Sequence, residues 1–110
     1  MAMTFTIVET WYLTDEAAQD ATRTMQIIDD AIGENAHHHP GWNGHATFLQ
    51  DLREPNVVTW VYPWRSKQDH VSLLETEEPL VQPLIDKYCT GPRTIRYTTE
   101  LPVEVEHDHH

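Results

Sequence analysis

The sequence VVTWVYPWRS, at residues 57–66, places three large aromatic side chains on alternate positions. Side chains two residues apart point to the same face of a β-strand, so this stretch predicts a strand with two unlike faces over residues 57–64. The aromatic face carries Trp60, Tyr62 and Trp64, and the opposite face carries Val57, Thr59 and Val61. The architecture depends on what covers each face.

Residues 4–12, near the start of the chain, are β-branched and aromatic with partial alternation, which is typical of a strand. Thr14 can then cap a helix, because its side-chain oxygen can accept a hydrogen bond from a free backbone N–H in the first turn. Apolar side chains at helical spacing favour a helix of about five to six turns. We expect Gly33 and Asn35 to weaken this helix and end it.

The residues between this helix and the aromatic strand predict a turn and a second strand. Pro40-Gly41 marks the turn. The strand that follows has Trp42, Gly44, Ala46 and Phe48 on one face and Asn43, His45, Thr47 and Leu49 on the other. The link over residues 53–56 is so short that the two strands should pair as an antiparallel hairpin.

The rest of the chain predicts two helical segments and a final strand. Ser66 can cap a short helix, and a second helix can start at Glu78-Pro79, because proline is tolerated in a first turn. Gly91-Pro92 ends that helix, and residues 93–101 form the last strand. The order β-α-β-β-α-β predicts an α+β fold of the ferredoxin-like, split βαβ kind, with an antiparallel four-stranded sheet.

Helices on one face of such a sheet leave its other face uncovered. We assign the small face of residues 57–64 to the helix side, because small branched side chains suit close packing. The aromatic face then lies away from the helices, and an exposed apolar surface of that size usually marks an interface or a ligand groove. A second copy of the sheet would cover it, which predicts a homodimer through the sheet face.

The composition limits the class of protein. The 110 residues carry a formal net charge of -11, which disfavours binding to nucleic acid, and no apolar run is long enough to cross a membrane. The single cysteine, Cys89, excludes an internal disulfide framework. No signal peptide is evident, so we expect a cytoplasmic protein. We expect one domain over residues 1–103 and a disordered, acidic and histidine-rich tail over 104–110.

Two short motifs carry a resemblance to a known family. Pro40-Gly41-Trp42 precedes the second strand, and Trp64-Arg65-Ser66, followed by Lys67 and Asp69, leaves the third. With the order of the predicted elements, these motifs resemble the antibiotic biosynthesis monooxygenase family, whose members are dimeric α+β barrels. The resemblance implies a cofactor-free oxygenase in which an electron-rich phenol is deprotonated in an aromatic pocket and reacts with oxygen.

Two alternatives stay open beside the oxygenase. One is a non-catalytic module that binds a small ligand or serves association. The other is a haem-binding or haem-degrading protein, in which His70 on the helix after Trp64 would bind the iron. The first predicted strand lacks the asparagine that the haem-degrading branch places there. The oxygenase interpretation implies no cofactor, because the substrate carbanion supplies the electrons, and the lack of a GxGxxG motif and of a P-loop is consistent with it.

The candidate site residues follow from these predictions. An imidazole at His45 could act as a general base near neutral pH. The predicted catalytic residues are His45, Asn43 and Trp64, and the predicted substrate-binding residues are Trp60, Tyr62, His70, Tyr88 and Arg96. The run His37-His38-His39 suggests a metal site, but adjacent side chains at a helix end do not converge easily, so we interpret it as a polar loop.

Overall fold

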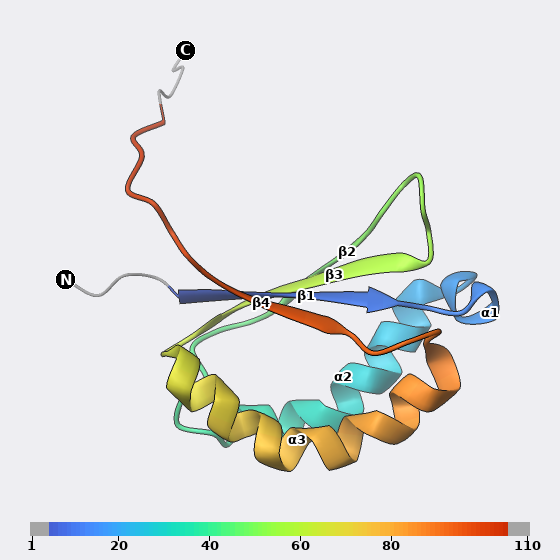
Figure 1. Ribbon diagram of the computed structural model, residues 1–110, viewed down its shortest axis with the longest axis horizontal. Coiled ribbons are helices and arrows are strands. Elements are labelled where there is room, and N and C mark those ends of the chain that lie inside the picture. The colour runs from blue at the N-terminus through green and yellow to red at the C-terminus, as the bar shows by residue number, and fades with distance from the viewer. Residues whose placement is uncertain (1–4, 106–110) are drawn as a thin grey trace.

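The computed structural model describes residues 5–105, which form an antiparallel four-stranded sheet with helices on one side (Figure 1). The elements are β1 (Phe5–Tyr12), α1 (Asp15–Ala18), α2 (Ala21–His37), β2 (Thr47–Gln50), β3 (Val57–Trp64), α3 (Lys67–Tyr88) and β4 (Thr94–Thr99). The strand order in the sheet is β2-β3-β1-β4. The predicted α+β, ferredoxin-like class is confirmed.

The first helical segment differs from its prediction in both bounds and continuity. Thr14 does cap a helix, but α1 is only one turn long, and Asp20 caps α2 by accepting a hydrogen bond from the backbone N–H of Arg23. The helix α2 also continues past Gly33 to His37. Asn35 donates a hydrogen bond of 3.0 Å to Thr76 on α3, so a contact between the two helices supports the end that the sequence predicted to be weak.

The second helical segment is one helix rather than the predicted two. The helix α3 runs without a break through Pro79 and Pro83, both of which are exposed. Proline removes one helical hydrogen bond, and on the solvent side the freed carbonyl can bond to water instead. Buried side chains at four-residue spacing keep the whole helix on the sheet, and they are Leu73, Glu77, Val81 and Ile85. In Figure 1 α3 follows a shallow arc beside the sheet.

The second strand is shorter than predicted. Only residues 47–50 form β2, and Trp42 makes a single bridge to Trp64. Pro63 pairs with Thr6 of β1, but it has no N–H to donate towards the second strand, which disfavours regular pairing on that side. Gly44 has a φ of 141°, and a Cβ there would lie 3.0 Å from the Pro63 ring. The segment 42–46 therefore loops over the sheet instead of extending it.

The two faces of the sheet are the reverse of our assignment. The aromatic face of β3 is buried under the helices, and the small face is half-buried on the other side. The register of β1 extends each face, since Ile7 pairs with Tyr62 and Trp11 pairs with Val58. The rings fill the wide space between the sheet and the helices, whereas the small branched side chains form a flat surface. The aromatic face is therefore not the surface left for a second copy.

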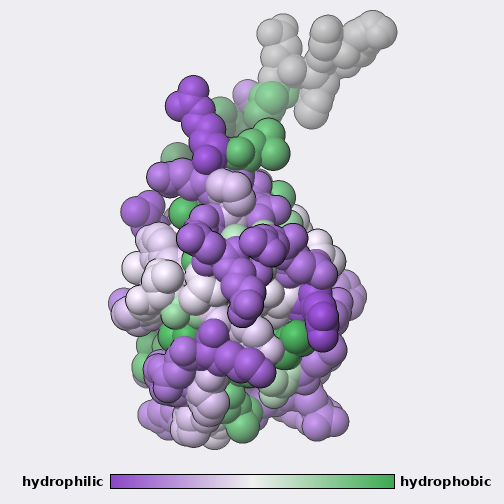
Figure 2. All heavy atoms as spheres, turned by 90° about the vertical axis from the view of Figure 1, so that its right-hand side faces the viewer, coloured by the Kyte–Doolittle hydropathy of each residue, from purple (hydrophilic) through white to green (hydrophobic). Residues whose placement is uncertain are grey.

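The surface of the molecule agrees with its acidic composition. The end that carries α1 shows mostly hydrophilic side chains (Figure 2). Within residues 5–105, no helix is both long and apolar enough to cross a membrane. Residues 106–110 of the predicted tail lie outside the described residues, and the proposed domain boundary stays a prediction.

Candidate functional site

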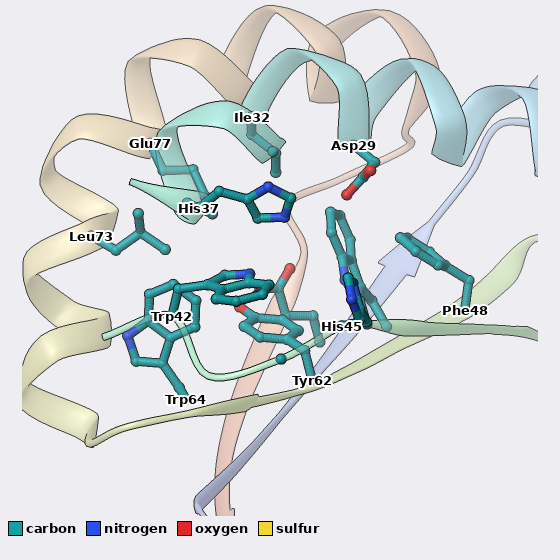
Figure 3. Close-up of a pocket in the computed structure, with 16 residues that line it drawn as sticks. Asp29, Ile32, His37, Trp42, His45, Phe48, Tyr62, Trp64, Leu73 and Glu77 are labelled. Carbon is teal, nitrogen blue, oxygen red and sulfur yellow. Dashed lines mark hydrogen bonds between the residues drawn. The ribbon is translucent and has the colours of Figure 1, made fainter. Parts of the chain in front are cut away.

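A cavity of about 210 Å³ lies between the sheet and the helices α2 and α3. Figure 3 shows side chains from the strands, from both helices and from the loop after α2 converging on it. Its aromatic walls come from Trp42, Phe48, Trp60, Tyr62 and Trp64. The ring centroids of Phe48 and Trp60 lie 4.6 Å apart, and those of Tyr62 and Trp64 lie 5.9 Å apart. These distances are typical of packed aromatic pairs.

The buried end of the pocket is formed by Glu9, Tyr62 and Glu77, whose exposed fractions are 1%, 9% and 3%. Arg93 binds both carboxylates, through NH1 to Glu9 Oε1 at 2.8 Å and through NH2 to Glu77 Oε2 at 2.7 Å. It also binds the more exposed Glu78 at 2.7 Å. A buried charge is tolerated where it is paired and hydrogen-bonded, and this cation holds the carboxylates in place.

The pKa values of this ion cluster are displaced by burial and by mutual interaction. Burial raises the pKa of Glu77 to about 7, although Arg93 opposes the shift. Burial alone would lower the pKa of Arg93, but Glu9 and Glu77 raise it above its ordinary value. Arg93 is therefore charged at every accessible pH, whereas Glu77 titrates near neutrality.

A second set of hydrogen bonds connects the buried end to β4. The hydroxyl of Tyr62 donates to Glu9 Oε2 and lies 2.6 Å from His70 Nε2. His70 Nδ1 lies 3.0 Å from the hydroxyl of Tyr97. Burial, together with the charge of Arg93, lowers the pKa of His70 to about 4, so its ring is neutral at physiological pH. Burial also raises the pKa of Tyr62 far above its usual range.

The open end of the pocket is formed by Asp29, His37 and His45. Asp29 is half-buried and the two histidines are exposed. Figure 3 shows the side chains of Asp29 and His37 directed from the helix side towards the cavity. The rings of both histidines contact the edge or face of Trp42, at centroid distances of 4.9 Å for His37 and 5.7 Å for His45. Burial, with the charge of Asp30, raises the pKa of Asp29.

Two buried indole groups have no hydrogen-bond partner among residues 5–105, and they belong to Trp60 and Trp64. The nitrogen of Trp64 lies against the loop after α2, because a Cβ built at Gly41 would lie only 2.4 Å from it. A larger residue at position 41 would displace the Trp64 ring. The predicted Pro-Gly-aromatic turn therefore has a physical cause, the close approach of the backbone to this tryptophan.

The structure places four of the predicted site residues in the pocket lining, and they are His45, Trp60, Tyr62 and Trp64. Asn43 is exposed, and Tyr88 lies at the far end of α3, so neither lines this cavity. Arg96 pairs with Val8 on the sheet face away from the helices. The roles predicted for these three residues stay predictions.

His70 differs from the solvated helix residue that its polar neighbours favoured, because its side chain is fully buried. It does not line the pocket itself but contacts two residues that do, Tyr62 and Trp64. Both ring nitrogens lie within hydrogen-bond distance of tyrosine hydroxyls. Neither is free to bind a haem iron, so the geometry argues against the role that the haem alternative requires.

The predicted site residues did not include four polar residues of the buried end, Glu9, Glu77, Arg93 and Tyr97. One signal was available for Glu9, which shares an inward face of the first strand with Ile7 and Trp11. A carboxylate in such a position needs a buried cation. Its partner Arg93 is 84 residues away in the sequence, so no local pattern connects the two.

The histidine run after α2 does not converge on one point. The ring of His37 packs on Trp42, whereas His39 Nδ1 accepts a hydrogen bond of 2.9 Å from the backbone N–H of Gly41. Within residues 5–105, no group of three metal-ligating side chains is placed to hold an ion. The histidines of the tail at 107–110 lie outside the described residues.

Comparison with known proteins shows the fold. No family model and no curated protein matches the sequence. A monooxygenase from the gene ActVA-Orf6 of Streptomyces coelicolor, solved in complex with nanaomycin D, superposes with a TM-score of 0.74 at 17% identity, covering 96% of this chain and 94% of that one.

Two further solved structures are named as proposed antibiotic biosynthesis monooxygenases. The protein from Bordetella bronchiseptica has a TM-score of 0.70 at 10% identity, covering 90% of this chain and 98% of that one. The protein from Nitrosomonas europaea has a TM-score of 0.67 at 12% identity, covering 93% and 94%. The chain therefore shares the fold of the family that the sequence motifs resemble.

Proposed function

We propose that the protein is a cofactor-independent oxygenase that acts on a small phenolic aromatic molecule in this pocket. The observation that carries the proposal is the cavity of about 210 Å³ with aromatic walls. It is larger than the ~150 Å³ apolar cavity that binds benzene and smaller than the roughly 300 Å³ at which pockets for drug-sized ligands begin. A ligand of two fused rings suits a cavity between these sizes.

The polar groups at the two ends suit a phenol. Between the walls, a flat ring can pack against Trp60 and Tyr62, whose centroids lie 6.0 Å apart. A phenolic oxygen at the open end lies near His45, which we assign as the general base. Trp64 lines the cavity and positions the ring of the substrate. The neighbour of the same fold that holds a bound ligand supports the proposal, but its identity to this chain is only 17%.

1-Naphthol is a phenol with two fused rings, and its oxidation serves as the example of the proposed reaction. His45 takes the phenolic proton, and the naphtholate supplies the electrons that reduce O2, forming a C–O bond at ring carbon 4. Protonation of the resulting peroxide, loss of the hydrogen at carbon 4 and cleavage of the O–O bond give 1,4-naphthoquinone and water. One oxygen atom of O2 enters the product, and the substrate is oxidised without a flavin or a metal.

The test is oxygen uptake by the purified protein with 1-naphthol, together with chromatography of the quinone. We expect one O2 consumed for each naphthoquinone formed. Replacing His45 with Ala should lower kcat by about 10²-fold or more, because general bases contribute factors of that size. An unchanged rate removes His45 from the mechanism, and a wild-type protein that binds 1-naphthol without oxidising it favours the non-catalytic ligand-binding module.

We also propose that the protein is a homodimer through the sheet face, now with the small side chains at the interface. The face away from the helices carries Val8, Thr10, Val57, Thr59 and Val61, all half-buried in the single chain. These five small side chains give a largely uncharged surface, with Arg96 beside Val8 on the neighbouring strand, and such a surface suits packing against a second sheet.

Light scattering after size exclusion tests the dimer. We expect twice the mass of one chain for the wild type and one mass for Val61→Lys, which places a charge in the interface. Thr22→Lys, at an exposed position of α2, is the matched control and should stay dimeric. A monomeric wild type contradicts the proposal.

A further inference from the structure

The hydrogen bonds at the buried end form one continuous chain from the pocket wall to β4. The chain runs from Glu9 through Tyr62 and His70 to Tyr97. Glu9 lines the cavity at one end, and Tyr97 is half-buried near the surface at the other, with Lys67 Nζ 5.4 Å from its ring centroid. The two middle members are buried. The chain therefore joins the inside of the pocket to the outside by a route separate from the open end.

The number of protons available fixes the direction of every bond. Glu9 accepts at Oε1 from Arg93 and Trp11, and at Oε2 from Tyr62. A phenol has one proton, so Tyr62, which donates to Glu9, must accept its second bond from His70 Nε2. A neutral imidazole has one N–H, so Nδ1 must accept from Tyr97. All three donors point towards the pocket.

We propose that this chain is a proton relay that delivers protons from solvent to the pocket, with Glu9 as its catalytic end. The inference rests on the proposed function, because it supplies the proton that the bound peroxide needs. A carboxylate has about four acceptor positions, and Glu9 uses three of them, so one remains for the proton donated onwards to the substrate. Tyr62 and His70 act through Glu9 and are positioning and relay residues.

One delivery conserves protons at each group. The Tyr97 proton moves to His70 Nδ1 while the Nε2 proton moves to the oxygen of Tyr62, and the proton of Tyr62 moves to Glu9 Oε2. Solvent water reprotonates Tyr97. Glu9 passes its proton to the peroxide oxygen and returns to the carboxylate. His70 then carries its proton on Nδ1, and the hydroxyls must turn and the ring must exchange its proton before the next delivery.

His70→Gln separates a relay from a purely structural chain. An amide oxygen can accept from Tyr97 and an amide NH2 can donate to Tyr62, but a glutamine cannot exchange the two protons as an imidazole can. We expect kcat for 1-naphthol to fall about 10²-fold with KM unchanged, and the solvent isotope effect on kcat to be at least as large as in the wild type, because proton delivery then limits turnover. Tyr97→Phe, which removes the outer donor, should act in the same way.

The matched control is Tyr12→Phe, because Tyr12 is an exposed tyrosine at the end of β1, outside the pocket, and its loss should leave kcat unchanged. Nitrogen NMR of ligand-free wild type tests the direction of the chain without any turnover, and we expect His70 protonated on Nε2. Protonation on Nδ1 overturns the relay. Full activity in His70→Gln also overturns it and leaves the proposed function intact, whereas a wild type that forms no naphthoquinone overturns both.

Discussion

The two ends of the pocket differ in how their polar groups are held. At the buried end, the carboxylates of Glu9 and Glu77 bind Arg93, and the hydroxyl of Tyr62 has two partners. At the open end, the exposed ring of His45 packs edge-on against Trp42, and no side-chain hydrogen bond of His45 is found within residues 5–105. The buried end is fixed by the fold, whereas the side chains of His37 and His45 at the open end are exposed and have fewer partners to hold them. We therefore assign proton removal to the open end and proton delivery to the buried end.

The largest expected effect comes from removing the cation of the buried end. Arg93→Met leaves two buried carboxylates without a cation, and the free energy of unfolding should fall by about 3–5 kcal/mol, as is typical for a broken buried pair. Chemical denaturation measures the change. Arg65→Met is the control, because the Arg65–Asp69 pair is on the surface and should contribute less than about 1 kcal/mol. Equal losses of stability in the two variants would show that the buried ion cluster contributes no more to stability than the surface ion pair.

The pH dependence of stability separates two opposing groups at the buried end. The pKa of Glu77 rises from 4.5 to about 7 on folding. The contribution of Glu77 to the free energy of unfolding therefore falls as pH rises through that range. The pKa of His70 falls from 6.5 to about 4 on folding. The contribution of His70 to the free energy of unfolding therefore rises as pH rises from 4 to 6.5. The two contributions oppose each other between about pH 4.5 and 6.5.

Glu77→Gln removes one of the two opposing groups, so the pH dependence of stability that is due to His70 can be measured in this variant. We expect the free energy of unfolding of this variant to rise by roughly 2–3 kcal/mol between pH 4.5 and 6.5, and that of the wild type to change much less. Urea denaturation at several pH values gives both curves. Parallel curves would mean that Glu77 does not titrate in this range.

Substitutions at Gly33 should change stability least, and they test whether the ligand binds in the cavity between the two ends. Gly33 lies in α2 and lines the cavity, and the three nearest atoms to a Cβ built there belong to the Asp29 carboxyl at 3.8 Å or more. Gly33→Ala and Gly33→Leu should both stabilise the helix by about 0.5–1 kcal/mol. Only the leucine fills the cavity, so only Gly33→Leu should lose 1-naphthol binding, measured by calorimetry. Binding retained in Gly33→Leu would place the ligand elsewhere.

The sequence predicts much of the fold because periodicity and turn residues are local signals. The strand over 57–64 follows from alternation, and its antiparallel pairing with the second strand follows from the short link between them. Alternation does not say which face is buried, and our assignment of Trp60 to the outer face was wrong because it considered only the sizes of the side chains. The distance between the helices and the sheet, which large rings fill, is a property of the whole fold.

The candidate site is predictable only in part, for a similar reason. His45 and Trp64 were found because they lie next to recognisable turns and strand ends. The buried end joins Glu9, Glu77 and Arg93 from three distant segments, and its chemistry exists only after folding. Pro79 was wrongly interpreted as the start of a second helix, because the sequence does not show that its side of α3 faces solvent.

The proposed function requires that molecular oxygen is added to a phenol in this pocket without a cofactor. The most direct measurement is a turnover of 1-naphthol under 18O2 in ordinary water, with rapid quenching and mass spectrometry of the naphthoquinone. We expect one labelled oxygen atom in each quinone that the wild type forms, and no labelled quinone from the Gly33→Leu variant. Quinone whose new oxygen is unlabelled, or no quinone from a wild type that binds 1-naphthol, would contradict it.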